Sequence, residues 1–166
     1  MAYRNKTYIA FDGDNDIHYY RLMTAWAANE KFDMNFSDAH DLNYARDSSQ
    51  EESIKKQLRD RFANSKLFIV LIGENTWRLT KFVKWEMEVA LRLNLPIVGV
   101  NLNGERERDS LCPATINDEL ALYVSFGDKI IAQAMEVWPA EDAALRAKGK
   151  TGPYRFDDRT YKSLGL

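Results

Sequence analysis

Residues 67–93 read LFIVLIGENTWRLTKFVKWEMEVALRL, and this stretch decides the fold class of the chain. It opens with an unbroken apolar run, which is typical of a strand buried on both faces of a parallel sheet. After a polar loop, residues 81–93 repeat apolar side chains with the spacing of a helix. One face of this helix carries Phe82, Glu86, Val89 and Leu93. Glu86 therefore stands where a helix that packs on a sheet normally has an apolar side chain.

The same alternation of strand and helix signals extends in both directions along the chain. Apolar runs predict strands at residues 7–11, 34–36, 67–72, 96–102 and 121–126. Helical spacing predicts helices at about residues 17–28, 50–64, 81–93 and 129–137, the first with Asp16 as its N-cap. This alternation predicts an α/β fold, a flavodoxin-like three-layer sandwich with helices on both faces of its sheet. We expect a five-stranded parallel sheet with the strand order 2-1-3-4-5.

Composition fits a single domain and excludes several classes of function. The chain has 166 residues and a net charge of −2, which indicates no nucleic-acid partner. No apolar run approaches the about 18 to 20 residues that a membrane span needs. Cys112 is the single cysteine, and no signal peptide precedes the first strand, so we expect a cytoplasmic protein. Residues 1–138 are expected to form the domain, and residues 139–166 a C-terminal extension packed on it.

The expected strand order places two loops next to each other. In a flavodoxin-like sheet, ligands bind at the carboxyl ends of the strands where the strand order reverses. Residues 12–16 and 73–80 would then form the two sides of one crevice, with Glu86 on the helix that follows the second loop. A carboxyl group in partly apolar surroundings is a candidate catalytic group. The alternative is a structural acid that is paired with a lysine or an arginine.

The acidic loop after the first strand allows a second kind of chemistry. Asp12, Asp14 and Asp16 resemble the start of a calcium loop, but Ile17 occupies the position where that loop requires glycine. A strand followed by Asp-x-Asp also opens haloacid-dehalogenase-type phosphatases, with Asp12 as nucleophile and Asp14 as acid/base in a magnesium-dependent reaction. The later acidic pair of that family is missing here, which argues against a phosphatase. We therefore keep this function only as an alternative. Trp77, in the second loop, is either a core residue or a stacking surface for a nicotinamide or adenine ring.

Residues 70–91 resemble a motif of the TIR-domain family, in which a strand and a short loop precede S-x-W-C-x-x-E-x-x-x-A. Thr80 takes the serine position, Phe82 the tryptophan, Val83 the cysteine and Glu86 the acid. The first strand and its acidic loop are also similar to those of TIR domains. The closest resemblance is to the bacterial TIR-like group that includes ThsB of the Thoeris anti-phage defence system. The R-D-x-x-P-G loop of animal TIR adaptors is absent.

This resemblance implies a function and a set of site residues. It implies cleavage of the nicotinamide–ribose bond of NAD, followed by formation of a cyclic ADP-ribose-type signal, with Glu86 as the catalytic residue. NAD is then a substrate, and neither a cofactor nor a metal site is expected. The expected substrate-binding residues are Phe11, Asp12, Asp14, Trp77, Thr80 and Phe82. The expected partners are a second copy of the chain or a phage-derived trigger, and a downstream effector that senses the nucleotide product.

The same resemblance also allows a function without catalysis. TIR-like domains can serve as signalling modules that assemble through their helices and one loop, which corresponds to residues 38–48 here. In that case Glu86 would have no chemical role.

Overall fold

The computed structural model describes residues 6–29, 36–37 and 51–166. They form a six-stranded parallel sheet with the order β2-β1-β3-β4-β5-β6. The strands are β1 (Thr7–Ala10), β2 (Phe36–Ser37), β3 (Leu67–Ile72), β4 (Ile97–Asn101), β5 (Ala121–Ser125) and β6 (Pro153–Arg155). The helices are α1 (Ile17–Ala28), α2 (Glu51–Asn64), η3 (Thr76–Arg78, a 3-10 turn), α3 (Phe82–Arg92), α4 (Asp128–Ala147) and α5 (Asp158–Ser163).

The predicted fold class and strand order are confirmed, with one strand added. β6 pairs with β5 at the edge of the sheet, where Leu122 lies opposite Tyr154. Its three residues are exposed or half-buried and form no apolar run, which is why the pattern of the sequence did not predict a strand there. Of the short strand predicted at residues 34–36, Phe36 belongs to β2, and residues 34 and 35 lie outside the described part of the chain.

Helix α4 is longer than the sequence predicts. It continues through Pro139 to Ala147, so the predicted boundary between residues 138 and 139 lies inside a continuous helix. Proline removes one hydrogen bond from a helix, which is the reason for expecting an end there. On both sides of Pro139 the helix buries side chains, Trp138 before it and Asp142 after it, and this packing maintains the helix.

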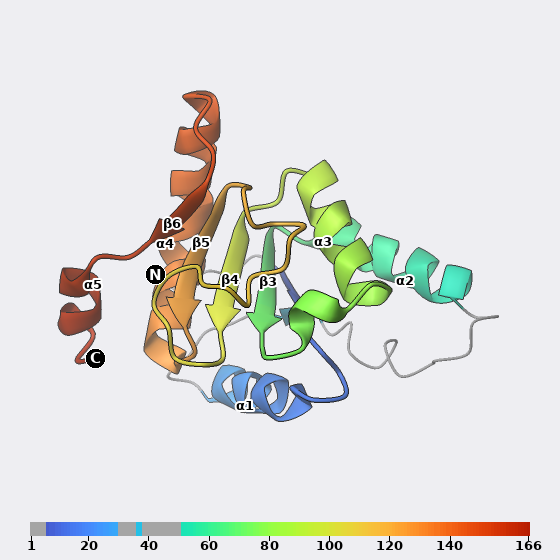
Figure 1. The fold of residues 1–166 in the computed structure, drawn as a ribbon, viewed down its shortest axis with the longest axis horizontal. Helices are drawn as coiled ribbons and strands as arrows, with labels where there is room; N and C mark the ends of the chain where they lie inside the picture. The colour runs from blue at the N-terminus through green and yellow to red at the C-terminus, as the bar shows by residue number, and fades with distance from the viewer. Residues whose placement is uncertain (1–5, 30–35, 38–50) are drawn as a thin grey trace.

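The two faces of the sheet bury separate apolar clusters. Successive residues of a strand point to opposite faces, so Tyr8 packs with α2 and α3 while Ile9 packs with α1 and α4. Helices α2 and α3 lie side by side on their face (Figure 1), and Phe62 of α2 meets Trp85 of α3 edge-on with ring centroids 6.1 Å apart. Glu86 is on the face that α2 and α3 cover.

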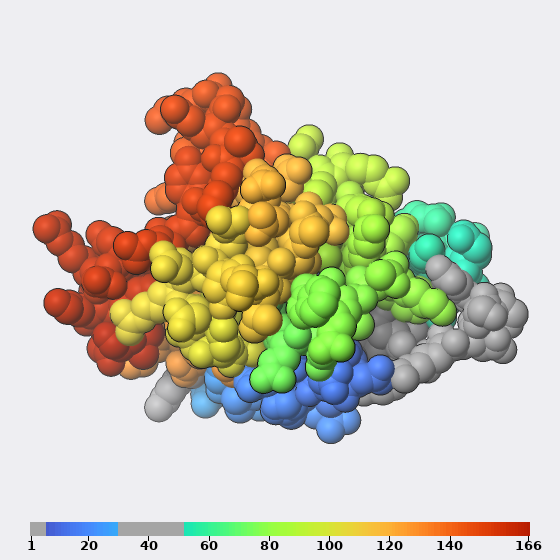
Figure 2. Space-filling view, viewed as in Figure 1, coloured from blue at the N-terminus to red at the C-terminus, as the bar shows by residue number. Residues whose placement is uncertain are grey.

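The C-terminal segment packs on the same body. Figure 2 shows residues after 150 in contact with the loop that follows β4. The guanidinium of Arg106 in that loop lies 4.0 Å from the ring centroid of Tyr161, and its Nη1 lies 3.9 Å from Asp158 Oδ1. Tyr161 is buried in the cluster beneath α1 and α4, so α5 is part of the folded domain.

Candidate active site

Glu86 lies in the second turn of α3, where the helix packs against β1. Its side chain is completely buried, at 0% exposure, and neither carboxyl oxygen has a hydrogen-bond partner among the described residues. Burial raises the pKa of Glu86 to about 8, and the facing Tyr8 hydroxyl opposes this rise only in part. At neutral pH the carboxyl group is therefore mostly protonated in this enclosed position.

The surroundings of Glu86 differ from both sequence expectations. No lysine or arginine of the described segments forms a salt bridge with it, so the expected structural ion pair is not found. The expected opening toward a crevice is not found either, because the side chain has no exposed surface. An ionisable group that is buried without a partner lowers the stability of the fold. Its presence in the core therefore needs an explanation outside the packing of the domain.

Aromatic rings form the wall between Glu86 and α2. Tyr8 stacks on Phe62 with ring centroids 3.9 Å apart and an interplanar angle of 14°. Trp85, the residue before Glu86 in α3, is approached by two cations of α2, with Lys55 Nζ at 5.7 Å and Arg59 Cζ at 5.9 Å from its ring centroid. These cations contact the indole ring, and no salt bridge among the described residues involves the buried carboxyl group.

Asp12, at the carboxyl end of β1, has its oxygens engaged within its own loop. Its Oδ1 accepts a hydrogen bond from the backbone N–H of Asp14 at 3.0 Å, and its Oδ2 accepts one from Asn15 Nδ2 at 2.7 Å. Asp12 is buried and Asp14 is exposed. The loop thus has the geometry of a turn held by an aspartate side chain, and Asp12 is committed to holding it.

Asp16 has a different position from the one that the sequence predicts. It is the residue before α1, but its side chain accepts no capping hydrogen bond, and its buried Oδ2 has no partner in the described structure. The carboxyl group contacts Gly73 so closely that a Cβ atom there would collide with it. Burial, followed by the charges of Asp12 and Glu74, raises the pKa of Asp16 to about 6. The two predicted sides of the crevice therefore touch at this point.

The loop after β3 is ordered by Thr76, a residue that the sequence did not single out. Its hydroxyl accepts a hydrogen bond from Gly73 N at 2.9 Å and donates one to Leu71 O at 3.3 Å. The loop then presents Trp77 outward: the residue is 55% exposed, its Nε1 donates to Glu74 O at 3.0 Å, and the Arg78 guanidinium lies 5.3 Å from its ring centroid. Trp77 is therefore a surface residue, with a ring face available for stacking.

The expected aromatic contact at Phe11 is not available in this structure. Phe11 is buried on the face covered by α1 and α4, stacked on Tyr20 with ring centroids 4.7 Å apart, whereas Glu86 is on the opposite face. The expectation that Phe11 and Glu86 share one crevice is wrong for their side chains. Phe82 is half-buried against the same apolar cluster as Glu86, and Thr80 is exposed just before α3.

The structure thus brings the predicted residues together in two groups rather than one. Glu86 and Tyr8 face each other between α3 and β1. Asp12 and Asp16 lie at the carboxyl end of β1 against Gly73. Within the described segments, no cluster of three or more histidine, cysteine, aspartate or glutamate side chains could hold a metal ion.

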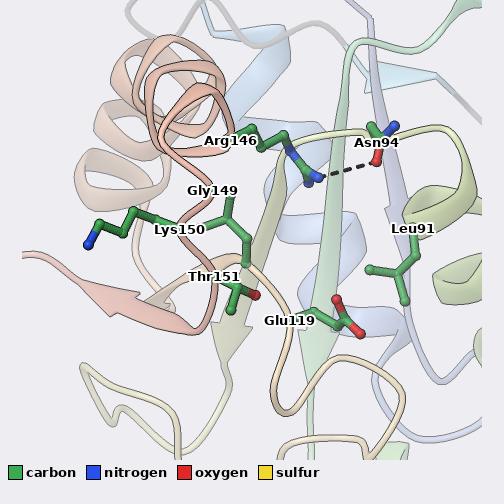
Figure 3. A pocket seen from close by; sticks show the side chains of 8 residues that line it. Leu91, Asn94, Glu119, Arg146, Gly149, Lys150 and Thr151 are labelled. Carbon is green, nitrogen blue, oxygen red and sulfur yellow. Dashed lines mark hydrogen bonds between the residues drawn. The ribbon is translucent and has the colours of Figure 1, made fainter.

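An open groove of about 500 Å³ lies at the other end of the sheet (Figure 3). It is lined by Leu91, Asn94, Glu119, Leu120, Arg146, Gly149, Lys150 and Thr151. Arg146 spans its rim: Nη1 donates to Asn94 Oδ1 at 3.2 Å, and Nε donates to the buried Asp142 Oδ2 at 2.8 Å. The guanidinium therefore joins the ends of α3 and α4. The groove contains none of the predicted site residues.

Residues 8–107 match the family described as Thoeris protein ThsB, TIR-like domain. The chain belongs to this family. The match begins in β1 and continues past α3, so it includes Tyr8, Asp12, Asp16 and Glu86. The protein is thus a TIR-like protein of the type found in Thoeris defence. No curated protein matches the chain. None of the helices in the described segments is long and apolar enough to cross a membrane.

Proposed function

We propose that this protein cleaves the nicotinamide–ribose bond of NAD, with Glu86 as the catalytic residue, and forms a cyclic ADP-ribose-type signal for a downstream effector. One observation supports this proposal above all: Glu86 is completely buried, and neither of its oxygens has a partner in the described structure. Core positions of α3 otherwise carry apolar residues such as Val83 and Met87. A costly acid that is kept in such a place is typical of a functional site.

The chemistry suits a single acid. Nicotinamide leaves NAD as a neutral molecule, so its departure needs no general acid. The ribose passes through an oxocarbenium-like transition state, which a nearby carboxylate stabilises. This stabilisation is stronger where water is excluded. Because the pKa of Glu86 is about 8 in the enclosed position, the catalytic form requires that the carboxyl group loses its proton.

The enclosed position also defines a requirement for activity. NAD reaches Glu86 only if α3 moves relative to β1 and α2, whose side chains cover it. We propose that self-association or a phage-derived trigger produces this opening. Trp77, exposed at the start of the same loop–helix segment, then offers a stacking surface for one of the rings of NAD.

The test is release of nicotinamide, measured by chromatography after the purified protein is incubated with NAD. It is done with and without lysate of phage-infected cells, because the trigger is part of the proposal. We expect Glu86→Gln to lower the rate at least about 100-fold, because it removes the charge that stabilises the transition state. Glu88→Gln is the matched control, since Glu88 is an exposed acid on the same helix and its removal leaves the rate unchanged. Equal rates for the wild type and Glu86→Gln would exclude Glu86 from the reaction.

The complete burial of Glu86 favours a second candidate function, that of a non-enzymatic assembly module. The loop expected to mediate assembly, residues 38–48, lies outside the described part of the chain. This candidate predicts defence activity that survives Glu86→Gln, with no nicotinamide released in any lysate. No observation favours the phosphatase alternative, because Asp12, its proposed nucleophile, is held by the hydrogen bonds of its own loop.

A further inference from the structure

We propose that Tyr8 is a positioning residue for Glu86, because its ring is held by two phenyl rings and its hydroxyl faces the buried carboxyl group. The consequence for catalysis rests on the proposed function. The interaction between the two side chains does not depend on the proposed function, because it is argued from their packing in the core. It is therefore tested separately.

The ring of Tyr8 is fixed from both sides. It stacks on Phe62 at 3.9 Å and on Phe68 at 5.9 Å between ring centroids, with interplanar angles of 14° and 24°. Tyr8 is 0% exposed and lies on β1, a strand of the sheet that pairs along its whole length with β3. Both its backbone and its ring are therefore held in place, and the residue of α3 that acts on its hydroxyl is Glu86.

Within the part of the chain that the structure describes, the polar atoms of the two residues have no alternative partner. The Tyr8 hydroxyl and both carboxyl oxygens of Glu86 are buried, and none of them makes a well-formed hydrogen bond to another group of the described chain. Both residues belong to the apolar face beneath α2 and α3. A buried hydroxyl and a buried carboxyl group in such apolar surroundings have, among the described residues, only each other as a possible hydrogen-bond partner.

The electrostatic effects on the two groups are consistent with this pairing. The Tyr8 hydroxyl opposes the rise in the pKa of Glu86, while burial and the Glu86 charge raise the pKa of Tyr8 well above its ordinary value. From α2, the charge of Arg61 lowers the pKa of Tyr8, while Lys55 and Arg59 lie over the ring of Trp85. Among the described residues, Tyr8 is the group that favours the ionised form of Glu86.

The test follows the ionisation of Glu86 by ¹³C NMR of protein labelled at glutamate carboxyl carbons, with the Glu86 signal assigned by its loss in Glu86→Gln. In Tyr8→Phe we expect the titration midpoint of Glu86 to move up by about half a pH unit or more. The matched control is Tyr123→Phe, which removes another fully buried tyrosine hydroxyl, one that contacts Cys112 Sγ at 3.2 Å. This control leaves the Glu86 midpoint unchanged.

An unchanged midpoint in Tyr8→Phe, or an equal movement in Tyr123→Phe, would overturn the inference. If Tyr8→Phe does not fold, Tyr8 is replaced by 3-fluorotyrosine, whose more acidic hydroxyl lowers the midpoint if the pairing exists and leaves it unmoved if it does not. The nicotinamide assay is a separate readout, in which the pH profile of Tyr8→Phe moves in the same direction as the NMR midpoint. A moved midpoint without nicotinamide release would reject the proposed function and keep the pairing.

Discussion

Among the described side chains, the helices bury two acids, Glu86 in α3 and Asp142 in α4, and their surroundings differ. Asp142 is 2% exposed, and its Oδ2 accepts a hydrogen bond from Nε of Arg146, one turn further along the same helix, at 2.8 Å. The same guanidinium reaches Asn94 at the end of α3. Glu86 is buried to the same degree, but the described residues provide it with no cation.

This difference shows that Asp142 is a structural acid, whereas the packing of the core does not explain Glu86. Asp142 has its counter-charge four residues away, which is the spacing that allows contact on a helix. At the corresponding positions around Glu86 stand Phe82 and Ala90, neither of which carries a charge. Asp142 therefore lies beside a cation of its own helix, whereas the described surroundings of Glu86 contain no cation partner and its burial favours the neutral form.

The largest expected effect is on stability at alkaline pH. A pKa raised from 4.5 to about 8 corresponds to about 5 kcal/mol of stability that the wild type has below pH 4.5 and loses as the pH rises to about 8. Glu86→Gln removes this loss, so above pH 8 the variant is the more stable protein, by up to about 5 kcal/mol. Urea unfolding of both proteins between pH 4.5 and 9 measures the difference. A difference that stays constant across this range would show that Glu86 ionises as freely in the folded state as in the unfolded state.

The next effect concerns the paired acid. Arg146→Met leaves Asp142 buried without its cation, and we expect a loss of about 3 kcal/mol in the free energy of unfolding. Arg92→Met is the control, because Arg92 is an exposed basic residue in the last turn of α3. Equal losses in the two variants would contradict the prediction, because they would show that the pair with Asp142 adds no stability beyond that of an exposed arginine.

The smallest effect is expected at Asp16, a third acid of intermediate character. Its pKa of about 6 lies above its ordinary value of 3.8, so it contributes stability below pH 3.8 that is lost as the pH rises to about 6. Asp16→Asn should raise the melting temperature at pH 7 by less than Glu86→Gln raises it at pH 9, and should have no effect near pH 3.5. Differential scanning calorimetry at both pH values checks this. A stabilisation that persists at pH 3.5 would have a cause other than ionisation.

Much of the fold could be predicted from apolar runs, because strands buried on both faces and helices on their surface impose different spacings on the sequence. These spacings predicted β1, β3, β4 and β5 and the helices that connect them. They did not predict β6, which pairs through its main chain at an exposed edge, or the full length of α4, which depends on what Trp138 and Asp142 contact. Main-chain pairing and tertiary contacts leave no periodic signal in a sequence.

The candidate site divides in the same way. Helical spacing was enough to place an acid, Glu86, on the apolar face of α3, because it decides which side chains share a face. The packing of the elements against one another was needed to show that this acid interacts with Tyr8 instead of a cation, that Phe11 lies on the opposite face of the sheet, and that Asp16 contacts Gly73. The physical reason is that spacing along one element specifies direction, whereas the partner of a side chain is supplied by another element, whose position depends on the packing of the whole core.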